Sequence, residues 1–287
     1  MTTPATAAPG ISAAIVGTAA GPLVHTLDAR WVMAYAAALG ERDGRYFDTT
    51  RPAGPLPHPL FPVCYEWPAV LAVRAQSLDE ALWPLGVHAT HHLVIHRPPR
   101  AGETLSTTAR VLGVSRRRSG ALVTLRVDTV GAAGEPVTTT DYGSVYRGVE
   151  ALGGATREAA PPLDAPVGAV RWSEPVALSQ HAAHVYSECA RIWNPIHTDI
   201  AIARAAGLPG LILHGTATLA LAVSRVVATD LDGDPRKVRE LAARFTGMVG
   251  IPSTLTVRGH ARHGDLVSFD TVDERGAPVL SQGILRA

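Results

Sequence analysis

The sequence lacks the features that mark several large classes of protein. Only two of its 287 residues are cysteines, Cys64 and Cys189, and they have no CxxC spacing, which argues against a disulfide-stapled secreted domain. The formal net charge of +1 gives no bulk attraction to nucleic acid or to a membrane surface. No apolar run is long enough for a membrane-spanning helix, and the Ala/Gly/Thr-rich start lacks the pattern of a signal peptide. We therefore expect a cytoplasmic protein without a nucleic-acid or membrane partner.

The composition is that of a folded protein. Hydrophobic residues make up 46% and charged residues 18% of the chain, which is long enough for two ordinary domains or one large one. The basic run "SRRRSG" at residues 115–120 is flanked by alternating apolar residues, which favours a solvated hairpin tip. A phosphate-rich ligand is the alternative interpretation. No Gly-x-Gly-x-x-Gly or P-loop pattern indicates a nucleotide site.

A Pro/Ala/Gly-rich segment at residues 148–170 divides the chain near its middle and reads as a linker. We predict an N-terminal domain at residues 1–150, a linker at 151–170 and a C-terminal domain at 171–287. Each half shows a short helix, an irregular polar stretch, an apolar helix and then strands. This repeated order indicates a duplicated unit.

The first half is predicted to begin with a loose or partly ordered lead-in over residues 1–23. Helical spacing covers residues 28–41, with an aspartate at the start, and residues 66–78. Runs rich in Val, Thr and Leu, punctuated by Gly or Pro, predict strands at 91–97, 102–115, 120–130 and 136–148.

The second half repeats this order. We predict a Ser-capped helix at 179–190 and a very apolar helix at 216–231, followed by strand-like runs at 241–250, 253–264 and 266–287. A helix that is apolar nearly all round suits the inside of a curled sheet. The pattern favours a duplicated α+β unit over a doubly wound fold.

A group of polar residues in the second half has the composition of an acid–base site. His197 is a proton carrier suited to neutral pH, and Asn194 offers both a donor and an acceptor. Gly215 precedes the apolar helix, where unpaired backbone amides and the helix dipole can stabilise an oxyanion. His214 could act here or only brace the turn, and Asp199 reads as the cap of the next helix.

The stretch "YSECARIWNPIHTDIAIARAAGLPGLILHGTATLALA" resembles the signature of the MaoC-like, R-specific enoyl-CoA hydratases (hydratase 2) of the hotdog superfamily. That signature is roughly Tyr-x-x-x-Ser-Gly-Asp-x-Asn-Pro-x-His-x-Asp, followed by Pro-x-x-His-Gly. The segments "HPLFPVCYEW", "LGVHATHHLVIHRPPRAGETL" and "GSVYRG" are similar to the degenerate first hotdog of two-domain members. The resemblance implies an α+β double hotdog, in which the first domain accommodates the acyl chain.

The resemblance also implies roles for individual residues. His197 would be the catalytic histidine, Asn194 its polar neighbour and Gly215 the oxyanion amide. The family's Ser-Gly-Asp stands here as Ala190, Arg191 and Ile192, so the catalytic aspartate is missing. The substrate-binding residues that we expect are Arg191, Ile192, Trp193 and His214.

The missing aspartate matters because hydration needs one group to activate water and another to protonate Cα. The candidate replacements for the aspartate are the carboxylates of Glu188, Glu66 and Asp43, although an exposed helix charge or a loop cap is the favoured interpretation of each. Four histidines alternate near residues 88–96, but no cysteine or carboxylate joins them at a metal-ligand spacing. We expect no metal site.

The leading hypothesis is a hydro-lyase, a hydratase or dehydratase of an acyl thioester carried by coenzyme A or by an acyl carrier protein. Coenzyme A or phosphopantetheine would enter as part of the substrate, and no separate cofactor is expected. One alternative is an isomerase or cyclase that uses His197 alone, and another is a non-catalytic thioester-binding partner subunit. The assembly could be a monomer or a homodimer.

Overall fold

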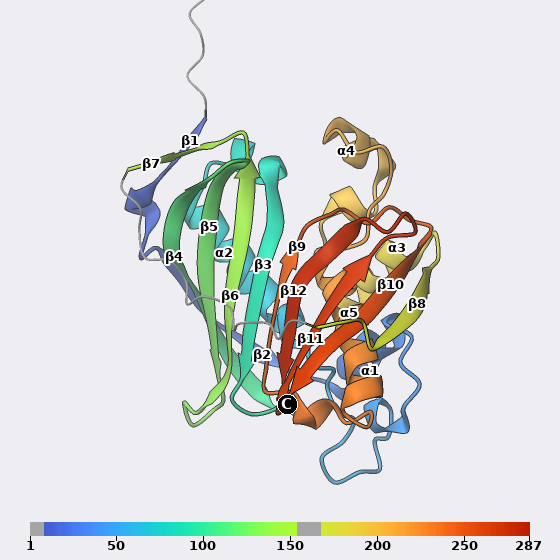
Figure 1. The fold of residues 1–287 in the computed structure, drawn as a ribbon. Helices are drawn as coiled ribbons and strands as arrows, with labels where there is room; N and C mark the ends of the chain where they lie inside the picture. Colours follow the sequence, from blue (N-terminus) through green and yellow to red (C-terminus); the bar gives the residue numbers. More distant parts are fainter. Residues whose placement is uncertain (1–8, 154–167) are drawn as a thin grey trace, which may run out of the picture.

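A 10-stranded antiparallel sheet runs through both halves of the described chain. The computed structural model describes residues 9–153 and 168–287. Most of the predicted linker, residues 154–167, lies outside the described residues, as do residues 1–8 of the predicted lead-in. The two curved parts of the sheet lie side by side in Figure 1. The domain boundaries at residues 150 and 171 stay predictions.

The strand order of the 10-stranded sheet is mirrored about its centre. It runs β2 (Ala19–Thr26), β4 (Thr104–Arg117), β5 (Gly120–Val130), β6 (Pro136–Arg147), β3 (Gly86–Ile95), β9 (Glu240–Phe245), β12 (Pro278–Arg286), β11 (Leu266–Val272), β10 (Ser253–His263) and β8 (Trp172–Leu178). The strands of the two halves meet where β3 pairs with β9. A short parallel pair, β1 (Gly10–Ser12) and β7 (Glu150–Leu152), lies apart from this sheet.

Each half wraps its strands against one long helix, α2 (Pro62–Ser77) or α5 (Gly215–Asp230), as Figure 1 shows. The predicted all-round apolar character of α5 is confirmed, because buried residues occur through its length. The shorter helices are α1 (Ala29–Ala38), α3 (Ala182–Ala190) and α4 (Ile200–Ala205), with 3₁₀ turns η1 (Ala13–Ile15), η2 (Gly44–Tyr46), η3 (Glu80–Leu85), η4 (Pro195–His197) and η5 (Pro235–Lys237). The predicted α+β double hotdog is confirmed.

Several predicted elements have different bounds in the structure. Of the two alternatives for the lead-in, the structure shows order over residues 10–26, which form β1, η1 and the edge strand β2. The second helix begins at Pro62 rather than residue 66, because proline fits the first turn of a helix. The run at 266–287 forms two strands, since the Asp273 carboxylate accepts the amides of Arg275 and Ala277 in a turn.

The predicted serine cap of α3 is wrong. The helix begins at Ala182 after His181, whose side chain makes no cap hydrogen bond. The Ser179 hydroxyl instead accepts the amide of His181 at 3.3 Å, in the turn that leads into the helix.

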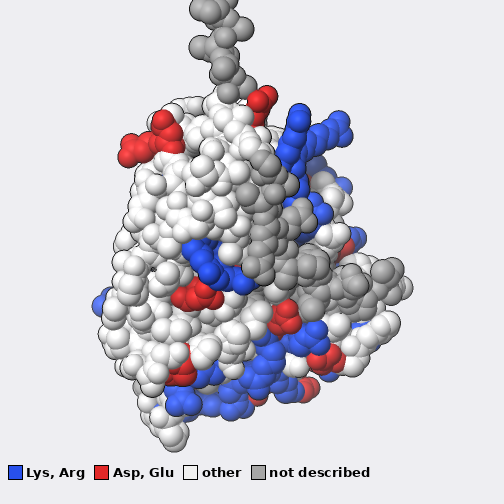
Figure 2. All heavy atoms as spheres, turned by 90° about the vertical axis from the view of Figure 1, so that its left-hand side faces the viewer, with Lys and Arg blue, Asp and Glu red and all other residues white. Residues whose placement is uncertain are grey.

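The surface carries basic groups in more than one place. The β4–β5 register runs to Arg117 opposite Gly120, which confirms the predicted hairpin tip. Figure 2 shows Lys and Arg gathered near the top and along the lower edge of one face, with acidic side chains interspersed and much of the surface neutral. Within the described ranges, no helix is long and apolar enough to cross a membrane.

Candidate active site

A cavity of about 180 Å³ lies where the two halves meet. The first half lines it with side chains from α2, β3, β5 and β6. The second half contributes residues from the segment around η4, the start of α5 and β9. The cavity therefore needs both halves, and it joins the predicted polar site to the predicted acyl-binding domain.

His197 lies in a compact turn that opens with Pro195. The His197 amide donates to the Asn194 carbonyl at 3.1 Å, and the Asp199 amide donates to the Pro195 carbonyl at 2.8 Å. The His197 Nδ1 atom lies 2.9 Å from the carbonyl oxygen of Ile212. A carbonyl only accepts, so Nδ1 carries the proton and Nε2 is a bare acceptor.

Burial keeps the His197 imidazole neutral. Desolvation lowers the pKa of His197 to about 4, although the hydrogen bond to Ile212 opposes the shift. The ring stacks on that of His214, with centroids 3.7 Å apart and planes 26° apart. Burial holds the pKa of His214 well below its usual range, and the repulsion that a second protonated ring would meet from a protonated His197 adds to this shift. His214 Nε2 also lies 3.1 Å from the Ser187 hydroxyl. Two neutral rings thus line this end of the cavity.

Gly215 is the first residue of α5 and lines the cavity. The first amides of a helix have no intrahelical partner and carry the positive end of its dipole. A Cβ at this position would lie 3.2 Å from two ring atoms of Phe245, so glycine permits the close packing of α5 on β9. The Gly215 amide is thus suited to stabilise an oxyanion in the cavity.

The structure brings some of the predicted substrate-binding residues to the cavity and leaves others away from it. Ile192 and Asn194 line the cavity beside His197 and His214. Ile192 is 4% exposed and presents no group that can carry a proton. Trp193 is 62% exposed and is not part of the lining.

Arg191 also turns away from the cavity. It ends α3 in the left-handed conformation, with φ of 57°. Its guanidinium lies 4.2 Å above the Trp31 ring and 3.3 Å from the Asp28 carboxylate. Arg191 therefore joins α3 to the start of α1, and the structure gives no support to its predicted contact with substrate.

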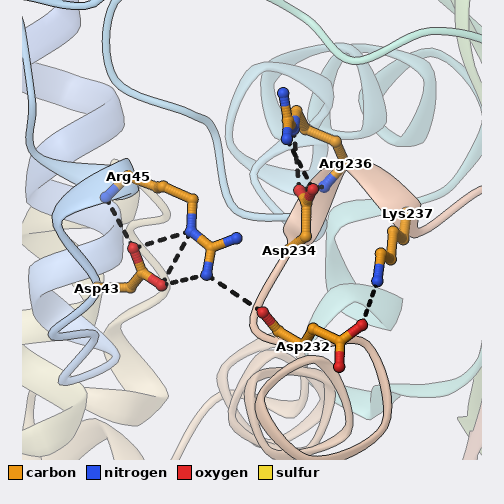
Figure 3. Close-up of polar contacts among 6 residues, drawn as sticks. All are labelled: Asp43, Arg45, Asp232, Asp234, Arg236 and Lys237. Atoms are coloured by element: carbon orange, nitrogen blue, oxygen red, sulfur yellow. Dashed lines mark hydrogen bonds and ion pairs between the residues drawn. The ribbon is translucent and has the colours of Figure 1, made fainter.

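Three acidic residues have the capping or exposed positions that we expected. Asp199 caps α4, because its carboxylate accepts the amides of Ala201 and Ile202 at 2.8 and 3.2 Å. Glu188 is exposed on α3. Asp43 caps η2 and pairs with Arg45 at 2.6 Å, and Arg45 also donates to the Asp232 carbonyl (Figure 3).

Glu66 departs from its expected interpretation as an exposed charge. It is 3% exposed, lies on α2 and lines the cavity. Its Oε1 accepts the hydroxyl of Thr140 at 2.8 Å, and burial raises the pKa of Glu66 to about 8. The interpretation failed because Glu66 lies on a face of α2 that is packed against β6 and lines the cavity, and the sequence pattern alone does not reveal this packing. The signal in the sequence is a single glutamate within the apolar run "PVCYEWPAVLAV".

The four histidines of the β3 region divide between the two faces of the sheet. His88 and His91 line the cavity. His92 pairs with Glu240 at 2.7 Å, and His96 lies 3.1 Å from the Thr139 hydroxyl. Within residues 9–153 and 168–287, no three potential metal ligands gather into one group.

Comparison with known families gives a match in each half. Residues 164–276 match the MaoC like domain, and residues 14–140 match the FAS1-like, dehydratase domain region. A probable enoyl-CoA hydratase 2 of Dictyostelium discoideum is 25% identical over 185 residues, which are 62% of each chain. The curated relatives that the chain matches are aligned over less than two thirds of their own length.

Solved structures share the fold over nearly the whole chain. A MaoC-like dehydratase from Phytophthora capsici superposes with a TM-score of 0.81 over 95% of both chains, at 22% identity. A Mycobacterium tuberculosis protein described as a double hotdog superposes with a TM-score of 0.63 at 18% identity, over 94% of this chain and 95% of that one.

Proposed function

We propose that this chain, in which residues 164–276 match the MaoC like domain and residues 14–140 match the FAS1-like, dehydratase domain region, adds water to a 2-enoyl thioester or removes water from a 3-hydroxyacyl thioester. The observation that carries the proposal is the hydrogen bond from His197 Nδ1 to the Ile212 carbonyl. It fixes one tautomer and leaves Nε2 as a bare base in a residue that lines the cavity.

In the hydration direction, Nε2 of His197 takes a proton from water as the water attacks Cβ. The amide of Gly215 stabilises the enolate oxygen that develops at the thioester carbonyl. The Asn194 side chain, which makes no cap hydrogen bond to η4, orients the attacking water. The imidazolium formed at His197 then returns the proton to Cα. Dehydration uses the same groups in reverse order.

Ile192 limits the rate of this proposed reaction, because its side chain cannot carry a proton. A positioned acid–base group contributes about 10²–10⁴-fold to a rate, so a site with His197 alone turns over slowly. Because position 192 is isoleucine, no carboxylate there favours the protonated form of the His197 imidazole, in agreement with the lowered pKa of His197. The Dictyostelium relative is named as a probable enoyl-CoA hydratase, which favours coenzyme A as the carrier of the acyl group. An acyl carrier protein is the alternative carrier.

The test is an assay with short and medium trans-2-enoyl-CoA thioesters. Wild type should hydrate them, His197→Ala should lower kcat by about 10²–10⁴-fold, and Ile192→Asp should increase it. A His197→Ala variant that keeps the wild-type kcat would overturn the assignment of the base.

The buried Ile192 also favours a second candidate, an isomerase or cyclase that relies on His197 alone. Such an enzyme would exchange a substrate proton with solvent deuterium without net hydration. Mass spectrometry of the recovered thioester after incubation in D₂O distinguishes the two reactions.

A further inference from the structure

The first-half side of the cavity contains a buried imidazole without a partner. His91 lies on β3, is 1% exposed and lines the cavity. Among the described residues, neither Nδ1 nor Nε2 of His91 has a hydrogen-bond partner. Burial lowers the pKa of His91 to about 3, so the ring is neutral at pH 7. It then offers one N–H donor and one bare acceptor.

Such a group does not suit a purely structural role. A buried polar atom without a partner costs stability, and an apolar side chain of similar size would avoid that cost. The rings of His88 and Tyr142 lie 5.4 and 6.5 Å from that of His91, both edge-on, and supply packing but no hydrogen bond to it. The donor and the acceptor of His91 are therefore available to a ligand.

Glu66 adds a second polar group to the same side of the cavity. Its Oε1 accepts hydroxyls from Thr140 and, at 3.4 Å, from Thr138. No ion pair with a cation is found for it within the described residues. With its pKa raised to about 8 by burial, Glu66 is a carboxylic acid at pH 7, and its O–H is a donor.

The position of His91 relates this polar region to the reacting end of the cavity. His91 pairs with Ala243 across the seam between β3 and β9. Phe245, two residues further along β9, lies against Gly215 and 4.3 Å from the His88 ring. An acyl chain whose thioester carbonyl lies at Gly215 thus reaches His91 by passing Phe245.

We propose that His91 and Glu66 form a subsite for a hydroxyl group on the acyl chain, distant from the thioester, so that the preferred substrates are hydroxylated acyl thioesters. The hydroxyl donates to the bare nitrogen of His91 and accepts a hydrogen bond from the Glu66 acid. This inference rests on the proposed function, because it takes the substrate to be an acyl thioester. A plain hydrocarbon chain would leave these buried groups without partners and bind less well.

The test compares trans-2-octenoyl-CoA with analogues that carry a hydroxyl on C5, C6 or C7. At least one analogue should exceed the plain thioester tenfold or more in kcat/KM. His91→Leu should remove that preference, Glu66→Met should reduce it, and His91→Gln, which keeps a donor and an acceptor, should retain part of it. Thermal unfolding of each variant checks that the fold is intact.

Binding of octanoyl-CoA and its hydroxylated analogues, measured by calorimetry on wild type and His197→Ala, separates the two proposals. Turnover without a hydroxyl preference would overturn the subsite and leave the proposed function intact. Hydroxyl-selective binding without turnover would support the subsite and overturn the proposed reaction. Failure of every thioester to bind would overturn both. If His91→Leu does not fold, the wild-type preference and the Glu66→Met variant still decide.

Discussion

The two halves each contain a pair of stacked rings ahead of their long helix. In the first half, Tyr46 on η2 stacks against His58, which precedes α2, with ring centroids 6.2 Å apart. In the second half, His197 on η4 stacks against His214, which precedes α5, with ring centroids 3.7 Å apart. The two pairs occupy matching places in the order of elements. Only the second pair lines the cavity. The ring pair of the first half therefore has a structural role, whereas the ring pair of the second half is accessible to a ligand.

The hydrogen bonds of the histidines explain this difference. His58 Nδ1 accepts the Leu60 amide at 3.0 Å, so Nε2 carries the proton and donates to the Ser224 hydroxyl at 3.2 Å. Both nitrogens of His58 are thus used. His197 uses only Nδ1. A histidine is available for chemistry when the fold leaves one nitrogen unpaired, and the residue type alone does not reveal this.

The turns that hold the rings differ in the same way. Asp43 caps η2 through the amide of Arg45 at 2.8 Å, whereas Asn194 makes no side-chain cap to η4. The first-half turn is further tied to the second half by Arg45, which donates to the Asp232 carbonyl (Figure 3). The first half fixes its polar groups here, while the second leaves the side chain of Asn194 free to act in the cavity.

The largest expected effect contrasts the two histidines. His197→Ala should lower kcat by about 10²–10⁴-fold and should lower the unfolding free energy less than His58→Ala does, because it removes one buried hydrogen bond rather than two. His58→Ala should lower the unfolding free energy by about 2–4 kcal/mol, because it removes two buried hydrogen bonds and leaves a cavity, and should preserve the activity of the folded fraction. Urea unfolding and initial rates test the pair. Equal effects of the two changes on kcat would refute the distinction.

Ile192→Asp should restore the second proton carrier of the family motif. We expect a tenfold or larger gain in hydration rate and a rise in the pKa of His197, because a nearby carboxylate favours the imidazolium. The buried charge should lower the unfolding free energy by about 1–3 kcal/mol. NMR titration of the imidazole and enoyl-CoA assays measure both effects, with Ile192→Asn as an uncharged control of similar size.

The free energy of unfolding should fall as the pH drops below about 6.5, the pKa of an unperturbed histidine. Burial lowers the pKa of His58 to about 3, of His91 to about 3 and of His197 to about 4, so the unfolded chain binds more protons than the native one between these values and 6.5. The stability is fully present above pH 6.5 and is lost as the pH falls toward 4. Urea unfolding at pH 7, 6 and 5 measures the slope, which His91→Gln should reduce by about one proton. An unchanged slope in that variant would contradict the burial of a neutral His91.

Arg191→Gly should have the smallest effect. Glycine relieves the left-handed backbone, which costs other residues about 1–2 kcal/mol, but the change loses the contacts with Trp31 and Asp28. The net change in unfolding free energy should lie within about 1 kcal/mol, with kcat unaltered. A large loss of activity would show that Arg191 serves the site after all.

The sequence predicted the elements well because periodicity and turn residues act locally. It also placed His197 and Gly215, since their neighbours in the chain form the turn and the helix start that position them. The pairing of β3 with β9 was not predictable, because it joins segments far apart in sequence whose alternation is compatible with many partners. Trp193 shows the opposite limit: it adjoins the site in sequence, yet the left-handed turn at Arg191 precedes it and it faces solvent.

The same physical reason explains the misplacement of Glu66 and the open role of His91. Whether a polar side chain is solvated or faces a cavity depends on which face of its element is covered. For Glu66 this was decided by the packing of α2 against β6, and for His91 by the packing of the two halves around the seam.

The pairing of β3 with β9 within one chain has a consequence for how this protein can change. In a symmetric dimer of identical subunits, every substitution occurs twice and must be tolerated at both equivalent places. Here the two halves are joined covalently and are encoded separately, so a substitution in one half, such as one at Ile192, occurs once. The other half can change independently. Asymmetry is therefore heritable in this architecture, and a new specificity can arise in one half while the other keeps its chemistry.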